Sequence, residues 1–137
     1  MKEKSRWIFK LIKALSVIGV AVILFGFVAI QVVSDLPGDR ISNVKTGVRS
    51  INAKAWSYYL DTGHLPESIQ DLLSNTRKLK NWKGPYIIEL QSKDPWGRRY
   101  MLRTPGLHGE IDVFSLGADG LVGGVELNSD IGNWESK

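Results

Sequence analysis

The stretch from Thr104 to Trp134 holds most of the residues that could do chemistry in this 137-residue chain. It has no lysine or arginine, seven of the 14 glycines and five acids, which are Glu110, Asp112, Asp119, Glu126 and Asp130. Carboxylate, amide and hydroxyl oxygens, with freed backbone carbonyls, are hard ligands that suit calcium. Aspartate, asparagine and glycine also favour ordinary turns. The residues alone therefore leave two readings open, a cation-binding loop and a set of turns.

The candidate ligands fall in two short groups, Asp119-Gly120 and Asn128-Ser129-Asp130. Their spacing is not that of an EF-hand loop. A zinc or copper site would have few suitable ligands, because the chain has no cysteine and only two histidines, His64 and His108. The lack of cysteine also excludes disulfides and cysteine nucleophiles, and it leaves the redox compartment open.

Catalytic patterns are weak in this sequence. It contains no nucleophile elbow, phosphate-binding P-loop or dinucleotide fingerprint. Glu110 and Asp112 would share one face of a strand and could imitate a catalytic carboxylate pair. Because two acids beside an apolar β run more often form an exposed face, we expect no enzyme and no small-molecule substrate. A membrane-tethered hydrolase is the alternative.

The elements that must position these residues begin with a long helix. After Pro37-Gly38, apolar residues recur at helical spacing and form one stripe: Ile41, Val44, Val48, Ile51, Ala55 and Tyr58. Gly63 is a candidate for the left-handed position that ends this helix. A short second helix is expected over 65–73, with Pro66 in its first turn.

Helical periodicity disappears after residue 84. The runs 85–90, 99–103 and 111–115 are typical of β-strands, and Asp94-Pro95-Trp96-Gly97 fits a tight turn between the first two. We therefore expect an α+β fold, with a small antiparallel sheet packed against the long helix.

The N-terminal part predicts a membrane anchor. From Ala14 to Ser34 the chain has 21 consecutive residues without formal charge, and as a helix they would extend about 31 Å, close to the roughly 30 Å hydrocarbon core of a bilayer. Five basic residues precede this run, which predicts a cytoplasmic arm over 1–13 and a translocated domain over 35–137. The alternatives are a cleaved signal peptide and a buried soluble helix.

The net charge of +4 belongs to the same N-terminal arm. Residues 14–137 hold thirteen bases and thirteen acids, so the expected globular part is neutral. A nucleic-acid-binding domain would carry its excess positive charge on the folded surface. We therefore expect no nucleic-acid partner.

Three strings between Gly84 and Trp134, namely GPYIIEL, KDPWGRRYMLRTPGLHGEIDVFSLGADG and SDIGNW, resemble the C-terminal domain of the major pseudopilin of type II secretion systems. The segment YYLDTGHLP, Tyr58–Pro66, resembles the end of that family's long helix. The resemblance implies a type IV pilin-like fold, in which a long N-terminal helix, membrane-spanning in its first half, packs on a small antiparallel sheet. It also implies the bacterial inner membrane, a periplasmic domain, and partners among other pseudopilins or secretion-system proteins, including self-association.

The same resemblance implies a bound calcium ion in the loop after the last main strand. By position, the family's liganding aspartate matches Asp119, and its closing acidic segment matches Asn128, Ser129 and Asp130. The carbonyl of Leu116 is expected as a backbone ligand. Asn128 stands where many family members have an acid, which predicts weaker affinity. The family's turn and packing residues match Asp94, Trp96 and Trp134.

The N-terminus differs from the family pattern. Pseudopilins have a basic leader, a glycine–phenylalanine cleavage site and a glutamate early in the apolar helix. Here Lys13 precedes the apolar run, the run contains no glutamate, and its Gly26-Phe27 pair lies well inside it. Two hypotheses follow: a structural component of a type II secretion pseudopilus, and a permanently anchored accessory module that docks on a partner without polymerising.

Overall fold

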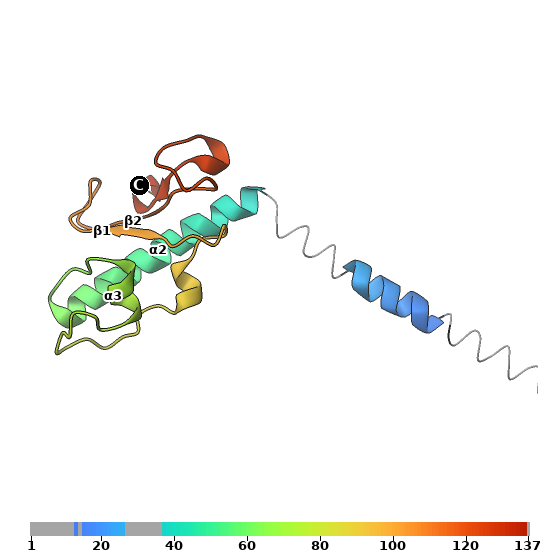
Figure 1. The fold of residues 1–137 in the computed structure, drawn as a ribbon, viewed down its shortest axis with the longest axis horizontal. Coiled ribbons are helices and arrows are strands. Elements are labelled where there is room, and N and C mark those ends of the chain that lie inside the picture. The colour runs from blue at the N-terminus through green and yellow to red at the C-terminus, as the bar shows by residue number, and fades with distance from the viewer. Residues whose placement is uncertain (1–12, 14, 27–36, 137) are drawn as a thin grey trace, which may run out of the picture. The chain divides into compact units, whose positions relative to one another are not determined.

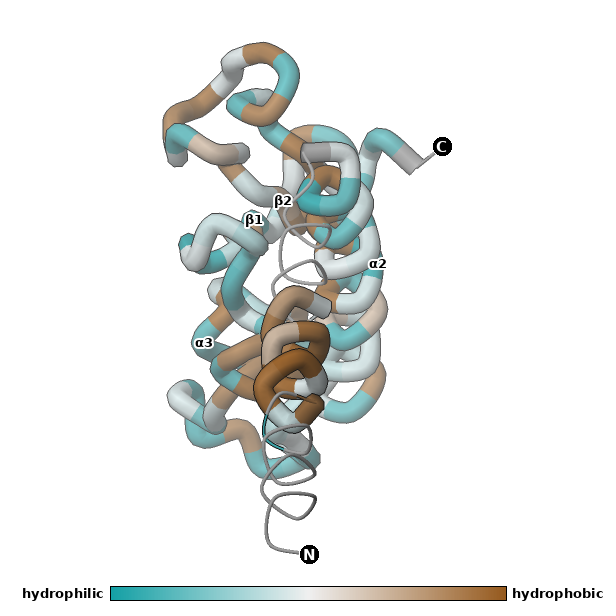
Figure 2. Tube along the Cα trace, turned by 90° about the vertical axis from the view of Figure 1, so that its right-hand side faces the viewer, coloured by the Kyte–Doolittle hydropathy of each residue, from teal (hydrophilic) through white to brown (hydrophobic). Residues whose placement is uncertain are grey.

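The computed structural model describes residues 13, 15–26 and 37–136, which fall in two units, residues 1–36 and 37–137 (Figure 1). In the first unit, residues 15–26 are helical and almost uniformly hydrophobic (Figure 2). Their large apolar side chains are exposed, from 56% at Val20 to 78% at Phe25. Residues 14 and 27–34 of the expected span lie outside the described residues. Within the described ranges, no helix is both long enough and apolar enough to cross a bilayer.

Helix α2 (Pro37–Thr62) is the long element of the second unit. It begins at Pro37, a residue that the first turn of a helix tolerates because its missing N–H would have no helical partner there. The apolar stripe is confirmed, since the side chains of Val44, Val48, Ile51, Ala55 and Tyr58 are all buried. Gly63, with φ of +72°, donates its N–H to the Tyr59 carbonyl at 2.8 Å, so the expected left-handed cap is also confirmed.

A three-stranded antiparallel sheet covers one side of α2 (Figure 1). Its strands are β1 (Met101–Arg103), β2 (Asp112–Ser115) and β3 (Ile131–Gly132), in the order β1-β2-β3. Leu102 lies opposite Val113, and Ser115 lies opposite Ile131. Helix α2 packs against β2 and β3. The predicted helix on a small antiparallel sheet is therefore confirmed, although the two-residue strand β3 was not predicted.

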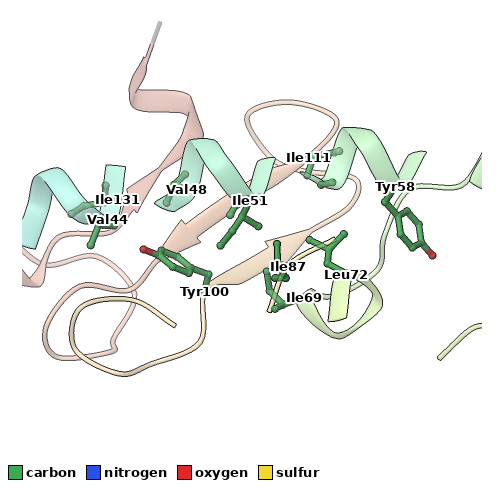
Figure 3. Packing of buried hydrophobic residues seen from close by; sticks show 12 residues of the cluster. Val44, Val48, Ile51, Tyr58, Ile69, Leu72, Ile87, Tyr100, Ile111 and Ile131 are labelled. Atoms are coloured by element: carbon green, nitrogen blue, oxygen red, sulfur yellow. The ribbon is translucent and has the colours of Figure 1, made fainter. Parts of the chain in front are cut away.

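The core lies between α2 and the elements that cover it. Figure 3 shows Ile51 of α2 directed toward Tyr100 and Ile87, and Val44 and Val48 belong to the same buried cluster. Val113 and Ile131 bring the sheet into the same cluster, and Leu72 brings in the short helix. Because side chains alternate along a strand, Val113 faces α2 while its neighbours Asp112 and Phe114 face the opposite side.

The predicted strand over 85–90 is wrong. The chain there runs into a 3-10 helix, η1 (Glu89–Ser92), and the side chains of Ile88 and Leu90 are exposed. The N–H groups of Tyr86 and Ile87 both point to the carbonyl of Leu72, at 2.8 and 3.4 Å, and not to a neighbouring strand. Since these donors are used by the short helix, they cannot build a sheet ladder.

The second helix is shorter than predicted: α3 covers only Ile69–Leu73. Pro66 precedes it, so the predicted place of Pro66 in its first turn is wrong. The Asp71 carboxylate accepts the N–H of Glu67 at 2.8 Å, and the Thr104 hydroxyl donates to the Pro66 carbonyl at 2.7 Å. These side-chain bonds satisfy the backbone of residues 66–67 outside a helix.

Candidate functional site

The acidic loop, residues 116–130, leaves the sheet at the end of β2 and returns at β3. Its two ends are held together by the Ser115–Ile131 pair and by a bond from the Ala118 N–H to the Leu127 carbonyl at 2.8 Å. Gly117 has φ of +66°, and a Cβ there would lie 2.7 Å from the carbonyl carbon of Asn128. A glycine is therefore needed at this position for both the backbone conformation and the close approach of the two ends.

Both aspartates expected to bind calcium lie in this loop and turn one oxygen onto its backbone. Asp119 Oδ1 accepts the N–H of Leu121 at 3.0 Å, and Asp130 Oδ2 accepts the N–H of Gly123 at 3.0 Å. The other oxygen of Asp130, Oδ1, is buried and has no hydrogen-bond partner among the described residues. Burying a charged oxygen without a partner is unfavourable, so a hydrogen-bond donor or a cation at this atom would stabilise the loop.

The other predicted ligands lie beside these aspartates along the chain. The hydroxyl of Ser129 donates to the Glu126 carbonyl at 2.7 Å, and the Asn128 N–H donates to the Val125 carbonyl at 3.0 Å. These bonds close the 3-10 turn η2 (Glu126–Asn128), which leaves Asn128 exposed. Leu116 is half-buried at the start of the loop.

The donor set fits calcium better than it fits a transition metal. Across the described residues, no three His, Cys, Asp or Glu side chains gather closely enough to hold a metal ion. An ion in the acidic loop would thus depend on Asp119, Asp130 and the hydroxyl and carbonyl oxygens around them. Calcium accepts such oxygen ligands in flexible geometry, whereas zinc sites use nitrogen and sulfur.

The base of the loop contains a polar pair that the sequence pattern did not assign to the site. Asp94 is 6% exposed and Ser115 is fully buried. The Ser115 hydroxyl donates to Asp94 Oδ2 at 2.6 Å. Asp94 was expected only as a turn residue, and Ser115 as the end of a strand. The Asp94-Pro95-Trp96-Gly97 turn was recognisable in the sequence. The sequence alone, however, does not say which distant residue bonds to the Asp94 carboxylate.

Asp94 also influences a neighbouring phenol. Burial raises the pKa of Tyr100 to about 12, and the negative charge of Asp94 adds to this rise. Burial disfavours the charged phenolate, and a nearby carboxylate disfavours it further. Tyr100 therefore keeps its proton to a higher pH than an exposed tyrosine would.

The structure does not bring Glu110 and Asp112 together as a catalytic pair. Asp112 is 1% exposed, and its oxygens accept the N–H groups of Leu107 at 2.6 Å and of His108 at 3.2 Å. The ring Nδ1 of His108 lies 3.1 Å from Asp112 Oδ2. Glu110 is exposed and precedes β2. The buried carboxylate therefore holds the 106–109 turn.

Comparison with known proteins identifies close relatives of the chain. A family model described as "Type II secretion system (T2SS), protein G" matches residues 31–134. Type II secretion system core protein G of Pseudomonas aeruginosa is 32% identical over 99% of this chain and 100% of that protein. Core protein G of Vibrio cholerae is 37% identical over 84% of this chain and 85% of that protein.

A solved structure gives the same result for the fold. The crystal structure of the major pseudopilin from the type 2 secretion system of enterohaemorrhagic Escherichia coli superposes with a TM-score of 0.58. The two sequences are 28% identical, and the match covers 70% of this chain and 87% of that one.

Proposed function

The chain belongs to the type II secretion system protein G family, and we propose that it is a structural, pseudopilin-like component of a type II secretion system. The observation that carries this proposal is the similarity to core protein G of Pseudomonas aeruginosa, which extends over 99% of this chain and the whole of that protein. We expect its partners to be other pseudopilins, other proteins of the secretion system and further copies of itself.

The secretion role is tested by deleting the gene in its native host and measuring the proteins released into the culture medium. We expect the secreted set to be retained in the cells and to be released again when the wild-type chain is supplied. Unchanged secretion by the deletion strain would contradict the role.

We further propose that residues 14–34 anchor the chain in the bacterial inner membrane, with residues 1–13 in the cytoplasm and 35–137 in the periplasm. The support is the uncharged 21-residue run, its five preceding basic residues and the exposed apolar side chains of residues 15–26. Protease added to spheroplasts should digest residues 35–137, whereas protection of that segment would contradict this orientation.

Calcium is proposed as the ion that stabilises the acidic loop, with Asp119, Asn128, Ser129, Asp130 and the Leu116 carbonyl as its ligands. The support is the family resemblance, the oxygen-only donor set and the buried Oδ1 of Asp130, which has no partner among the described residues. When bound, the ion would neutralise two carboxylates and supply the contact that this oxygen lacks.

The calcium proposal is tested on the full chain in detergent micelles. EDTA should lower the melting temperature and calcium should restore it, because a ligand at 100 times its Kd stabilises the folded state by about 2.7 kcal/mol. Asp130→Ala should abolish the calcium response. Glu126→Gln is the matched control, since Glu126 lies in the same loop but is not a proposed ligand. A wild-type melting curve that ignores both EDTA and calcium would remove the ion from the proposal.

The alternative function is a permanently anchored accessory module that does not polymerise. It is favoured by the apolar run 14–34, which has no glutamate and places Gly26-Phe27 far from its start. Co-expression with a prepilin peptidase separates the two functions. A faster-migrating band on a gel supports entry into a filament, and an unchanged band favours the accessory module.

A further inference from the structure

The turn at residues 94–98 is built around one buried carboxylate. Asp94 Oδ1 accepts the N–H groups of Trp96 at 3.0 Å and of Arg98 at 2.9 Å, and Oδ2 accepts the Ser115 hydroxyl at 2.6 Å. The backbone closes the same turn, because the Asp94 N–H donates to the Arg98 carbonyl at 2.8 Å. Both carboxylate oxygens are thus used, which fixes the position of Ser115 relative to the turn.

This turn holds both backbone polar groups of Gly117, the second residue of the acidic loop. The Gly117 N–H donates to the Ser115 hydroxyl oxygen at 3.2 Å, so it is linked to Asp94 through one side chain. The Gly117 carbonyl accepts Nη1 of Arg98 at 3.4 Å. Arg98 also lies against Gly120 of the loop, since a Cβ at Gly120 would be 2.6 Å from its Nε.

We propose that Asp94, Ser115 and Arg98 are positioning residues that set the calcium affinity of the acidic loop, an inference that rests on the calcium site proposed above. Gly117 lies directly after the Leu116 carbonyl and two residues before Asp119, so its orientation determines where these two proposed ligands point. Holding ligands in their bound geometry before the ion arrives raises affinity, because less order is then lost on binding. None of the three side chains is itself a proposed ligand.

Arg98 distinguishes positioning from simple electrostatics, because the two predict opposite changes in calcium affinity when its side chain is removed. A positive guanidinium near a cation site repels the ion, so removing it would tighten binding if charge alone mattered. If Arg98 acts by holding the Gly117 carbonyl, removing it weakens binding. The coupling is also reciprocal, so calcium should slow hydrogen exchange at the Gly117 and Arg98 amides.

The test is calorimetric titration of calcium into the full chain in detergent micelles. We expect the Kd to rise about tenfold for Ser115→Ala, which corresponds to about 1.4 kcal/mol, and about threefold for Arg98→Met. Arg98→Lys keeps a donor and should recover most of the affinity. Arg99→Met is the matched control, because Arg99 is also exposed but pairs with Glu89 at 2.8 Å instead of reaching the loop.

The outcomes distinguish the positioning role from the calcium site on which it rests. If the wild type binds calcium and the Ser115→Ala and Arg98→Met variants keep its Kd within about twofold, the positioning role is wrong and the calcium site stands. A tighter Kd for Arg98→Met would show electrostatic repulsion and also overturn it. If the wild type binds no calcium, both proposals about the ion fail together. Should Ser115→Ala not fold, Arg98→Met decides, because Arg98 is exposed.

Discussion

The core beneath α2 and the acidic loop differ in where their apolar side chains lie. Val44, Val48 and Val113 in the core are at most 1% exposed, whereas Leu121, Val122 and Val125 of the loop are 67–86% exposed. The core is therefore stabilised by removing apolar surface from water. The loop gains little from that effect and depends on backbone hydrogen bonds, on glycines in unusual conformations and on its anchorage at residues 94–98.

The two regions should therefore be sensitive to different kinds of substitution. A close-packed core responds to lost volume, because a cavity remains where the atoms were removed. A loop ordered by backbone contacts responds instead to changes in conformation, charge or bound ion. Substitutions at Ile51, Gly117 and Tyr100 test this distinction.

Truncation in the core should have the largest effect on global stability. Ile51→Ala removes buried atoms from a side chain that is 1% exposed, and it should lower the free energy of unfolding by about 2–5 kcal/mol. Leu121→Ala, at a loop position that is 67% exposed, is the control and should change it by less than about 0.5 kcal/mol. Urea unfolding of the full chain in micelles measures both. Equal losses would show that the loop is stabilised by burial after all.

Conformational strain should act mainly on the loop. Gly117→Ala places a Cβ against the Asn128 backbone at positive φ. It should lower the free energy needed to open the base of the loop by about 1–3 kcal/mol. Hydrogen exchange at the Ala118 amide, which donates to Leu127, should become roughly 10–100 times faster. Gly123→Ala is the matched control: φ is also positive, at +94°, but nothing lies within 4 Å of a Cβ there. A similar acceleration in both variants would remove the role assigned to the close approach at Gly117.

Alkaline pH should act on the core through Tyr100, with the smallest effect of the three. Its pKa is raised from 10.0 to about 12, so the folded state keeps a proton that the unfolded state has lost. The stability that this phenol contributes is complete below about pH 10 and falls as the pH rises toward 12. Tyr100→Phe should make that alkaline fall shallower, as measured by urea midpoints between about pH 9 and 11. An unchanged slope, with the same number of late-titrating tyrosines by absorbance, would contradict the burial of this group.

The length and buried face of α2 could be predicted from the sequence, because its apolar residues recur at helical spacing and all face the core. The stripe from Val44 to Tyr58 is buried as predicted, and Gly63 ends the helix as predicted. The run 85–90 misled the prediction, because its apolar residues suggest a strand while its N–H donors are taken by Leu72. Helix α3 lost its expected first turn in the same way, to the side chains of Asp71 and Thr104.

The candidate site was only partly readable. The acids and glycines of the loop were evident as a group, and their chemistry follows from residue type. The contribution of Asp94, Ser115 and Arg98 was not evident, because Asp94 and Ser115 lie 21 positions apart in the chain and Arg98 and Gly117 lie 19 positions apart. Short polar contacts of this kind leave no periodic trace.

The family, the long helix with its core face, and the stretch rich in oxygen ligands could all be predicted from the residues alone. These follow from properties that adjacent residues carry, namely hydropathy, charge and backbone freedom. Only the tertiary structure decided that the 94–98 turn supports the base of the acidic loop, that Asp112 holds a turn beside His108 and that one oxygen of Asp130 is buried without a partner among the described residues. A side-chain hydrogen bond needs its two atoms about 3 Å apart. Asp94 and Ser115 lie 21 positions apart along the chain, so only the folded chain brings them to that separation.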